Sequence, residues 1–388
     1  MIRWDQDERE RLRDGLAAAG ADGWLLFDFQ EANPVARRVL GLTGLGSRRL
    51  FVLLPREGEP VAVAHRIELQ ALQEFPGRIV PYARYGELHQ ALRDLVQGRT
   101  LAMEISPNDD VPYLDRVPWG VVELIRGAGA TVVPSAPLVT TFAARWSARE
   151  LEDHLVAAEA LARIARQAVG EAVREIGLSE TALQARVVTA MEGEGFTMEH
   201  APIVGFGAHA ADPHYQPVAG QDAILALDQV VLLDLFGGRP GSVPADQTWM
   251  GFSGSPPAKV QRVWETVRDA RDAALDAVQR AAREGTPLQG RMVDRAARDL
   301  IEAAGFGDFF VHRTGHSIDR ALHGSGPHCD DYETRDDRLL LPGVGFSVEP
   351  GIYLAGEFGI RSEVNVYWGA DGPIVTPGEI QRELIVPR

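Results

Sequence analysis

The stretches His312-Arg313-Thr314-Gly315-His316 and Ser347-Val348-Glu349-Pro350-Gly351 carry the strongest signal in the 388-residue chain. Each sets an ionisable side chain, His316 or Glu349, beside the glycine or proline that favours a tight turn. Three more acids end or interrupt strand-like runs elsewhere in the sequence: Asp234, Asp246 and Glu363. Two aspartates, one histidine and two glutamates supply oxygen and nitrogen ligands without a thiolate, which suits two divalent ions sharing a bridging water. Hydrolysis is the chemistry that such a pair performs well, so we expect a hydrolytic metal centre.

Asp234 lies in surroundings that are costly for an unpaired charge. It interrupts the apolar residues of 230–236, where an ionised carboxylate loses its hydration unless a partner or a metal compensates. The alternatives are an edge position that faces solvent, or a cap for the turn at Gly237-Gly238. Asp246 alone would be an ordinary loop aspartate, and its interpretation depends on a partnership with Asp234.

Three of the ten histidines fall within one short polar segment: His312, His316 and His323. A helical zinc-peptidase motif is disfavoured, because Gly315 interrupts the segment and no glutamate stands beside His312. Solvated loop histidines are the other alternative. Glu349 and Glu363 stand at strand positions, where two acids on neighbouring strands repel each other unless cations hold them together. Each acid could instead be a charge on an edge strand.

The composition is that of a soluble globular protein, with 45% hydrophobic and 24% charged residues. The net charge of −16 argues against non-specific binding to nucleic acid or to an anionic membrane. The single cysteine, Cys329, excludes an internal disulfide framework and is expected as a surface thiol in a reducing compartment. No apolar run approaches the roughly 18 residues of a membrane span, and residues 1–8 lack the apolar segment of a signal peptide. We therefore expect a cytoplasmic protein.

The first third of the chain alternates short apolar strands with helices, which predicts an α/β domain. Helical patterns and strand-like runs alternate along it: helices at 7–19 and 86–96, strands at 24–29, 50–54, 61–64 and 101–105. A domain boundary is expected within 131–147, because Pro134 and Pro137 interrupt a β-branched run there.

Beyond that boundary, helices and strands alternate in two rounds. Ser147, with Glu150 three residues later, forms a capping-box pattern that begins a helix expected to end at Ile176. A second helix is expected to begin at Ser179, and two further helices are expected later in the chain: 257–283 and 288–304. Each pair of helices is followed by strands, so the order predicts an α+β domain built from two similar halves.

The order of the five candidate ligands resembles that of a known family. Gly-His stands at the third ligand, Glu-Pro-Gly at the fourth and Gly-Ile-Arg-x-Glu at the fifth, as in the "pita-bread" metallopeptidases. That family includes methionine aminopeptidase, aminopeptidase P, prolidase and the metal-free creatinase. The similarity covers residues 145–388. The resemblance implies a creatinase-like α/β N-terminal domain over 1–142 and a duplicated α+β pita-bread catalytic domain over 143–388.

The resemblance also implies that two metal ions are bound by five residues: Asp234, Asp246, His316, Glu349 and Glu363. Asp246 and Glu363 would bridge the two ions, and the complete set argues against creatinase. His214 matches the histidine that faces the substrate in this family, and His312 and His323 match two further active-site histidines. The carboxylate-rich set suits manganese, with zinc or cobalt as alternatives.

The creatinase-like front domain points to enzymes that act at Xaa-Pro bonds. We expect hydrolysis of the amide before proline, with Glu349 passing a water proton to the leaving nitrogen and His323 stabilising the oxyanion. Arg335, fourteen residues before Glu349, resembles the arginine with which prolidases bind the proline carboxylate, or it is a surface charge among acidic neighbours. Arg361 is grouped with the substrate-side residues, as a partner that steadies Glu363.

The favoured function is that of an Xaa-Pro dipeptidase, ahead of an Xaa-Pro aminopeptidase that acts on longer peptides. The substrate is therefore expected to be a proline-containing di- or oligopeptide. A non-catalytic binding protein and a metal-independent hydrolase are alternatives that the complete ligand set disfavours. The resemblance also implies a homodimer.

Three features depart from the family pattern: Pro244, Trp249 and the segment 324–329 after His323. These departures concern the substrate pocket more than the metal ligands. Trp249 and Tyr215 are the aromatic residues that we expect in that pocket.

Overall fold

A computed structural model describes residues 5–44 and 46–387, and the chain divides into two compact units, Met1–Ala143 and Ala144–Arg388. The expectation about a signal peptide rests partly on residues 1–4, which lie outside the described residues. Within the described part of the chain, no helix has both the length and the hydrophobicity needed to cross a bilayer. The predicted organisation, an α/β unit followed by an α+β unit, is confirmed.

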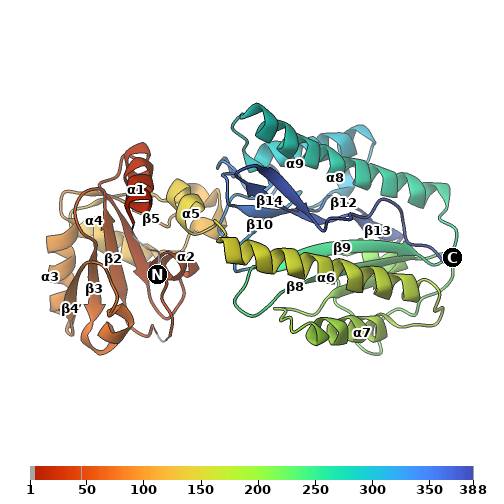
Figure 1. Ribbon diagram of the computed structural model, residues 1–388, viewed down its shortest axis with the longest axis horizontal. Coiled ribbons are helices and arrows are strands. Elements are labelled where there is room, and N and C mark those ends of the chain that lie inside the picture. The colour runs from red at the N-terminus through yellow and green to blue at the C-terminus, as the bar shows by residue number, and fades with distance from the viewer. Residues whose placement is uncertain (1–4, 45, 388) are drawn as a thin grey trace. The chain divides into compact units, whose positions relative to one another are not determined.

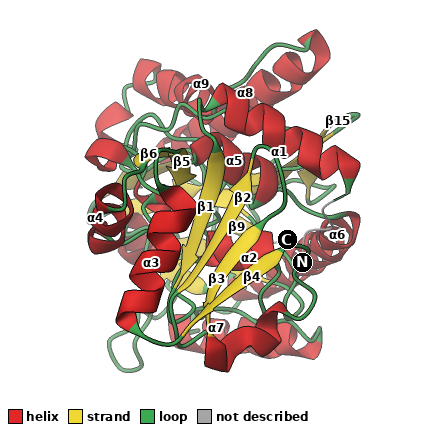
Figure 2. Ribbon diagram, turned by 90° about the vertical axis from the view of Figure 1, so that its left-hand side faces the viewer, coloured by secondary structure: helices red, strands yellow, loops and turns green. Residues whose placement is uncertain are grey.

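The N-terminal unit is built on a six-stranded mixed sheet (Figure 2). In sheet order, its strands are β4 (Arg78–Tyr82), β3 (Val61–His65), β2 (Leu50–Pro55), β1 (Gly23–Asp28), β5 (Thr100–Met103) and β6 (Thr131–Pro134). The pairs β1–β2 and β2–β3 are antiparallel, whereas β3–β4, β1–β5 and β5–β6 are parallel. The predicted strands of this unit are therefore confirmed, and β4 and β6 are additional.

Helices cover both faces of this sheet. One face packs on three helices: α1 (Gln6–Ala18), α2 (Pro34–Leu40) and α5 (Ala136–Phe142). The other face packs on two helices: α3 (Tyr85–Val96) and α4 (Trp119–Gly127). In β1, Trp24 and Leu26 point to the first face, and Leu25 and Phe27 point to the second. Because this strand is buried on both sides, its sequence is a continuous apolar run rather than an alternating one.

The sequence did not predict α2, α4 and α5. Pro34 and Pro137 lie in the first turns of α2 and α5. Backbone N–H groups in a first turn have no carbonyl partner within the helix, so a proline there costs no hydrogen bond. Pro137 therefore lies in a helix instead of interrupting a strand, whereas Pro134 is the last residue of β6.

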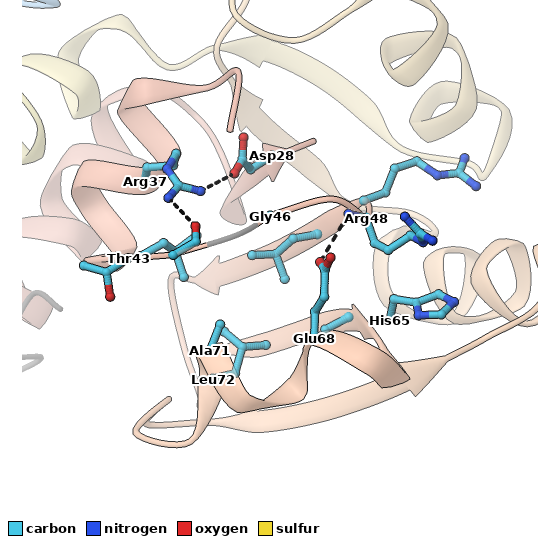
Figure 3. Close-up of a pocket in the computed structure, with 14 residues that line it drawn as sticks. Asp28, Arg37, Thr43, Gly46, Arg48, His65, Glu68, Ala71 and Leu72 are labelled. Atoms are coloured by element: carbon cyan, nitrogen blue, oxygen red, sulfur yellow. Dashed lines mark hydrogen bonds and ion pairs between the residues drawn. The ribbon is translucent and has the colours of Figure 1, made fainter. Parts of the chain in front are cut away.

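A small cavity of about 30 Å³ lies in the N-terminal unit between α2 and the 3₁₀-helix η1 (Arg66–Leu72). Two of its charged groups, Arg37 and Asp28, form an ion pair, and Glu68 bonds the neighbouring backbone (Figure 3). Arg37 Nη1 lies 3.2 Å from Asp28 Oδ2, and Glu68 accepts hydrogen bonds from the backbone amides of Ser47 (2.9 Å) and Arg48 (3.2 Å). Glu68, on η1, therefore holds Ser47 and Arg48, which precede β2, by hydrogen bonds to their backbone.

The C-terminal unit has two long helices with strands between them (Figure 1). The first half contains α6 (Ala148–Ala172, 25 residues) and α7 (Glu180–Gly193, 14 residues), followed by β7 (Ile203–Phe206), β8 (Val230–Gly237) and β9 (Ala245–Phe252). The second half contains α8 (Ala258–Glu284, 27 residues) and α9 (Gly290–Ala303, 14 residues). They are followed by β10 (Ser317–Ile318), β11 (Gly345–Val348), β12 (Gly351–Leu354), β13 (Phe358–Arg361), β14 (Val364–Gly369) and β15 (Gly372–Thr376). Each half thus has a long helix, a 14-residue helix and then strands, as the sequence predicted.

The capping box at the start of α6 is confirmed. Ser147 Oγ accepts a hydrogen bond from the Glu150 amide, and Glu150 Oε2 accepts one from the Ser147 amide at 2.8 Å. The helix ends at Ala172, four residues before the predicted end at Ile176.

The hairpin of β8 and β9 separates two hydrophobic cores. Val231 and Leu233 pack with α6 and α7, whereas Val230 and Leu232 pack with α8 and α9. Since strand side chains alternate between faces, Asp234 shares the face of Val230 and Leu232 and points toward the second half.

Glu104 is a fully buried carboxylate in the N-terminal unit. It accepts hydrogen bonds from Trp24 Nε1 at 2.5 Å, Asn33 Nδ2 at 3.0 Å and Ser135 Oγ at 3.1 Å. Burial raises the pKa of Glu104 from its ordinary value of 4.5 to about 7, although these three donors oppose the shift. Between those two pH values the folded chain keeps a proton that the unfolded chain has released, so the stability of the fold decreases as the pH rises.

We predict that Glu104→Gln reduces the pH dependence of unfolding between pH 4.5 and 7. The wild-type free energy of unfolding should fall across this interval by up to roughly 3 kcal/mol more than that of the variant. Urea unfolding followed by tryptophan fluorescence measures the difference, because Trp24 lies against Glu104. Glu123→Gln, on the exposed side of α4, should behave like the wild type. Parallel pH profiles for wild type and Glu104→Gln would contradict the prediction.

Candidate metal centre

The five predicted ligands come from five places in the C-terminal unit. Asp234 lies on β8 and Asp246 on β9. His316 immediately precedes β10 (Ser317–Ile318), and Glu349 immediately follows β11 (Gly345–Val348). Glu363 lies between β13 (Phe358–Arg361) and β14 (Val364–Gly369). Two more strands complete this region: β12 (Gly351–Leu354) and β15 (Gly372–Thr376).

These five side chains share one buried neighbourhood. His316 Nε2 lies 3.3 Å from Asp246 Oδ2 and 3.3 Å from Glu349 Oε1. Asp246, His316 and Glu363 each offer a ligand atom, and these three atoms lie within 4.8 Å of one another. Asp234 is within electrostatic range of Asp246 and Glu349. Residues far apart in the chain therefore meet at the junction of the two halves.

Backbone pairing explains the glycine before His316. A Cβ atom at Gly315 would lie 2.0 Å from the carbonyl oxygen of Ser347, so no side chain fits at that position. The close approach allows the His316 amide to donate to Ser347 Oγ at 2.9 Å and the Glu349 amide to donate to the Thr314 carbonyl at 2.6 Å. The two sequence motifs are thus the two strands of one local ladder, which holds His316 and Glu349 side by side.

Asn365 joins the second half to the hairpin of the first half. Its side-chain amide donates to the Asp246 carbonyl at 2.8 Å, and its side-chain oxygen accepts from the Asp246 amide at 2.9 Å. Thr248, which shares the face of Asp246, donates through Oγ1 to Glu363 Oε2 at 2.8 Å. These bonds fix Asp246 and Glu363 against each other.

The charges in this pocket are not balanced by protein groups. Burial raises the pKa of Asp234 to about 8 despite the nearby guanidinium of Arg361. Burial, with the charges of Asp246 and Glu349 adding to it, raises the pKa of Glu363 well above its usual range. Among the described residues, Asp234 Oδ1 and Glu363 Oε1 are buried and have no hydrogen-bond partner. A buried carboxylate oxygen without a donor is an unsatisfied ligand, so the residues fit a divalent cation.

Arg361 contacts a different acid from the one that the sequence suggested. Its Nη2 lies 2.5 Å from Asp234 Oδ2, and its Nε donates to Thr248 Oγ1 at 2.7 Å. Arg361 reaches Glu363 only indirectly, through Thr248, which bonds both side chains, and through its charge, which lies within electrostatic range of Glu363. Arg361 is buried, and it also donates to the Pro213 carbonyl at 3.4 Å.

The predicted histidines lie around this cluster. His312 Nε2 is 2.7 Å from the hydroxyl of Tyr353, and the ring of His323 stacks edge-on with that of His316 at 4.4 Å between centroids. Burial lowers the pKa of His312 to about 4 and that of His323 to about 3, so both rings are neutral near pH 7. His214 is exposed and lies within electrostatic range of His323.

Arg335 is the predicted site residue that the structure does not bring to the cluster. Its side chain is exposed and makes no hydrogen bond or ion pair with the described residues. Arg338, three residues later, is buried and binds Asp336 and the carbonyls of Ser325 and Gly326. That network holds the segment after His323 in place.

The departures from the family pattern have local explanations. Trp249 lies on the face of β9 opposite Asp246 and packs with α6, so the expectation that it lines the substrate pocket is wrong. The Pro244 carbonyl is 2.9 Å from Nδ1 of the buried His154. In the segment 324–329, a side chain at Gly324 would collide with Asp319.

Cys329 is fully buried, which contradicts the expected surface thiol. Its backbone pairs with Gly315 in both directions, at 3.0 and 3.1 Å. Three polar residues around the ligands were also missed by the sequence analysis: Thr248, Tyr353 and Asn365. Thr248 alone had a usable signal, because it stands two residues after Asp246 in a strand and so shares its face.

Comparisons with known proteins agree with this arrangement. Residues 153–369, more than half of the chain, match metallopeptidase family M24. A Mycobacterium tuberculosis protein named probable dipeptidase PepE is 29% identical over 347 residues, which cover 87% of this chain and 86% of that protein. The crystal structure of dipeptidase PepE from Mycobacterium ulcerans has 25% identity and a TM-score of 0.78, covering 99% of each chain. The Xaa-Pro dipeptidase of Lactobacillus helveticus is 34% identical over 161 residues, which cover 42% of this chain and 40% of that protein.

We predict that Glu363→Gln weakens the binding of Mn²⁺ at least about 100-fold, because it removes one charge from the cluster. Thr248→Ala, which removes only a hydrogen bond to Glu363, should weaken binding about tenfold. Isothermal titration of metal-free protein measures both effects.

Glu357→Gln provides the matched control for Glu363→Gln. Glu357 is exposed and ion-paired with Lys259, so its replacement should leave Mn²⁺ affinity unchanged. A Glu363→Gln protein that binds Mn²⁺ as tightly as the control would show that Glu363 is not a ligand.

Proposed function

The chain belongs to metallopeptidase family M24, the pita-bread peptidases, and from that membership we propose that it is an Xaa-Pro dipeptidase that hydrolyses the amide bond before proline. The observation that carries the proposal is the buried cluster in which ligand atoms of Asp246, His316 and Glu363 lie within 4.8 Å of one another. The dipeptidase relatives, which match most of the chain, support the dipeptide substrate. The shorter match to an Xaa-Pro dipeptidase supports the choice of bond.

Two divalent ions fit the donor set of the proposed site. The residues that would hold them are the five predicted ligands: Asp234, Asp246, His316, Glu349 and Glu363. Asp246 and Glu363 would be shared between the ions. Manganese suits the carboxylate-rich set, and zinc or cobalt are the alternatives. Bound ions of this kind supply a water that loses its proton near neutral pH.

Glu349 is the proposed proton carrier. Its Oε1 accepts a hydrogen bond from Ser347 Oγ at 3.0 Å and lies 3.3 Å from His316 Nε2, so the carboxylate is held in one orientation. In the proposed reaction the water oxygen adds to the carbonyl carbon, and Glu349 accepts the water proton. Glu349 then delivers that proton to the proline nitrogen as the C–N bond breaks, which yields a free carboxylate and free proline.

His323 provides a hydrogen-bond donor to the substrate, and His312, whose Nδ1 donates to the Arg313 carbonyl at 2.7 Å, is proposed to shape the site beside it. A neutral imidazole has one N–H group, which His323 would direct at the oxygen that gains charge during the addition. His312 is oriented by the hydroxyl of Tyr353. His214 is exposed and belongs to the first half of the unit, whereas His312 and His323 belong to the second. We propose that His214 also contacts the substrate.

Selectivity for proline cannot use a hydrogen bond from the scissile nitrogen, because the Xaa-Pro amide has no N–H. The ring shape and the ends of the peptide must supply it. We propose that Arg335, which is exposed and lies outside the ligand cluster, binds the proline carboxylate from that position, which is the feature that separates a dipeptide from a longer substrate. An Xaa-Pro aminopeptidase is the second candidate, since nothing in the metal ligands themselves distinguishes the two enzymes.

Two further parts of the proposal rest on composition and on the family. The acidic, disulfide-free chain is proposed to act in the cytoplasm. A homodimer is proposed because the family commonly forms one.

The manganese-loaded protein should hydrolyse Ala-Pro with a kcat/KM at least about tenfold higher than that for Ala-Pro-Ala. The reason is that only the dipeptide places its carboxylate next to the proline ring. Release of the free amino acids, measured by chromatography, gives both values. Preference for the tripeptide would favour the aminopeptidase, and cleavage of neither peptide with manganese, zinc or cobalt would favour a binding protein.

Arg335→Ala tests the cation within the same assay. It should raise the KM for Ala-Pro about tenfold or more while leaving kcat nearly unchanged. Arg283→Ala, at the exposed end of α8, is the matched control. An Arg335→Ala protein with the KM of the control would remove Arg335 from the proposed site.

Glu349→Gln should lower kcat roughly 100-fold or more, because the amide cannot carry the proton. Metal content must be measured on the same sample, since Glu349 is also a proposed ligand. A variant that keeps both its metal and full turnover would exclude Glu349 as the proton carrier.

A further inference from the structure

Glu180 is a buried carboxylate outside the metal cluster whose hydrogen bonds converge from several segments. It is the first residue of α7 and has no exposed surface. Oε1 accepts a hydrogen bond from the Phe206 amide at 2.6 Å, and Oε2 accepts one from the Ala223 amide at 2.7 Å. The hydroxyl of Tyr215 donates to Oε2 at 2.8 Å, and His209 Nδ1 lies 3.0 Å from the same oxygen.

All of these partners border or belong to one loop. Phe206 ends β7, and Ala223 lies shortly before β8, so residues 207–222 form the connection between the two amides. Asp222 adds a second tie, because its Oδ2 accepts hydrogen bonds from the amide (3.1 Å) and hydroxyl (2.5 Å) of Thr181. We call residues 207–223 the β7–β8 loop. Both of its ends are thus bonded to the first turn of α7.

Tyr215 ties the middle of the loop to the same carboxylate. Burial and the neighbouring Glu180 raise the pKa of Tyr215 above its usual value, so the hydroxyl keeps its proton and remains a donor. The ring also packs on that of His209, with 4.4 Å between centroids. The residue immediately before Tyr215 is His214, which is exposed and lies within electrostatic range of His323.

The loop also contacts the strands that carry the metal ligands. A Cβ atom at Gly359 would lie 2.0 Å from the Ala210 carbonyl oxygen, so β13 packs directly on the beginning of the loop. Arg361, two residues after Gly359, donates to the Pro213 carbonyl and is bonded to Asp234. The segment that bears His214 is therefore held between Glu180 on one side and the metal centre on the other.

We propose that Glu180 is a positioning residue, which holds the β7–β8 loop through Tyr215 so that His214 faces the substrate. This inference rests on the proposed function, because it assigns His214 a contact with an Xaa-Pro peptide. Glu180 touches neither the metal ligands nor the substrate. Its contribution is to keep the exposed His214 in one place, since a misplaced contact of this kind costs catalytic efficiency even when the chemistry is intact.

A double-mutant cycle separates this role from a general structural one. Tyr215→Phe removes only the hydroxyl that bonds Glu180 and keeps the ring. In the wild-type background it should lower kcat/KM for Ala-Pro about tenfold, mainly through KM. In a His214→Ala background, the same change should cost less than about twofold, because the residue through which it acts is absent. Equal losses in both backgrounds, or no loss in either, would overturn the proposal.

Glu180→Gln repeats the cycle from the carboxylate side, and Glu175→Gln is its matched control. Glu175 is an exposed glutamate five residues earlier, paired with Arg186, and its replacement should change neither KM nor kcat. Manganese content should be unchanged in Tyr215→Phe and Glu180→Gln.

Hydrogen exchange provides a readout that does not depend on activity. Both variants should speed the exchange of backbone amides in the β7–β8 loop while leaving α9 unchanged. A wild-type protein that cleaves no Xaa-Pro peptide would refute the proposed function alone. Unchanged exchange in the loop of both variants would refute the positioning role alone.

Discussion

Four carboxylates buried in one pocket are the constraint on which the structure of the C-terminal unit depends. Each one costs free energy when it leaves water, and each raises the cost for its neighbours. Arg361 and His316 offset part of this charge, but two of the oxygen atoms are left without any donor. Such a cluster avoids this cost only when its carboxyls keep their protons or when cations enter it, so its geometry fits a ligand set better than a hydrophobic core with accidental charges.

The two halves of the unit share this cluster unequally. The first half contributes two aspartates on adjacent strands of a hairpin, and the second contributes the histidine and both glutamates. Neither half holds a complete set, so the halves must pack closely for the site to exist. The alternation of side chains along β8 decides this packing, because Leu233 and Leu235 face α6 and α7 while Asp234 faces the other half. The same alternation that builds two cores therefore also places the ligands between them.

The sequence predicted those features that depend on short-range patterns. The capping box at Ser147 and the apolar spacing of the long helices were sufficient to find α6 and α8, and the motifs around His316 and Glu349 pointed to residues that the structure places in one buried cluster. Features that depend on long-range contact were wrong or missed. Trp249 packs with α6 because of the face of β9 that it occupies, and Cys329 is buried because its backbone pairs with Gly315, a contact that the sequence does not show. The ion-pair partner of Arg361 is Asp234, which is 127 residues away in the chain.

Asn365 has a consequence for how this chain can change in length. Its two hydrogen bonds to the backbone of Asp246 fix the position of β14 in the second half relative to β9 in the first half. One extra residue in β9 or β14 would shift the pairing of Asn365 with Asp246 by one residue. It would also turn the acid next to that contact, Asp246 or Glu363, to the opposite face. Insertions and deletions in these two strands would break that register, while the exposed turn residues 239–241 and the exposed end of α8 have no such restriction. Chains of this kind should therefore differ in length in the turn before β9 and after α8. The number of residues from Asp246 to the end of β9 at Phe252 should stay constant.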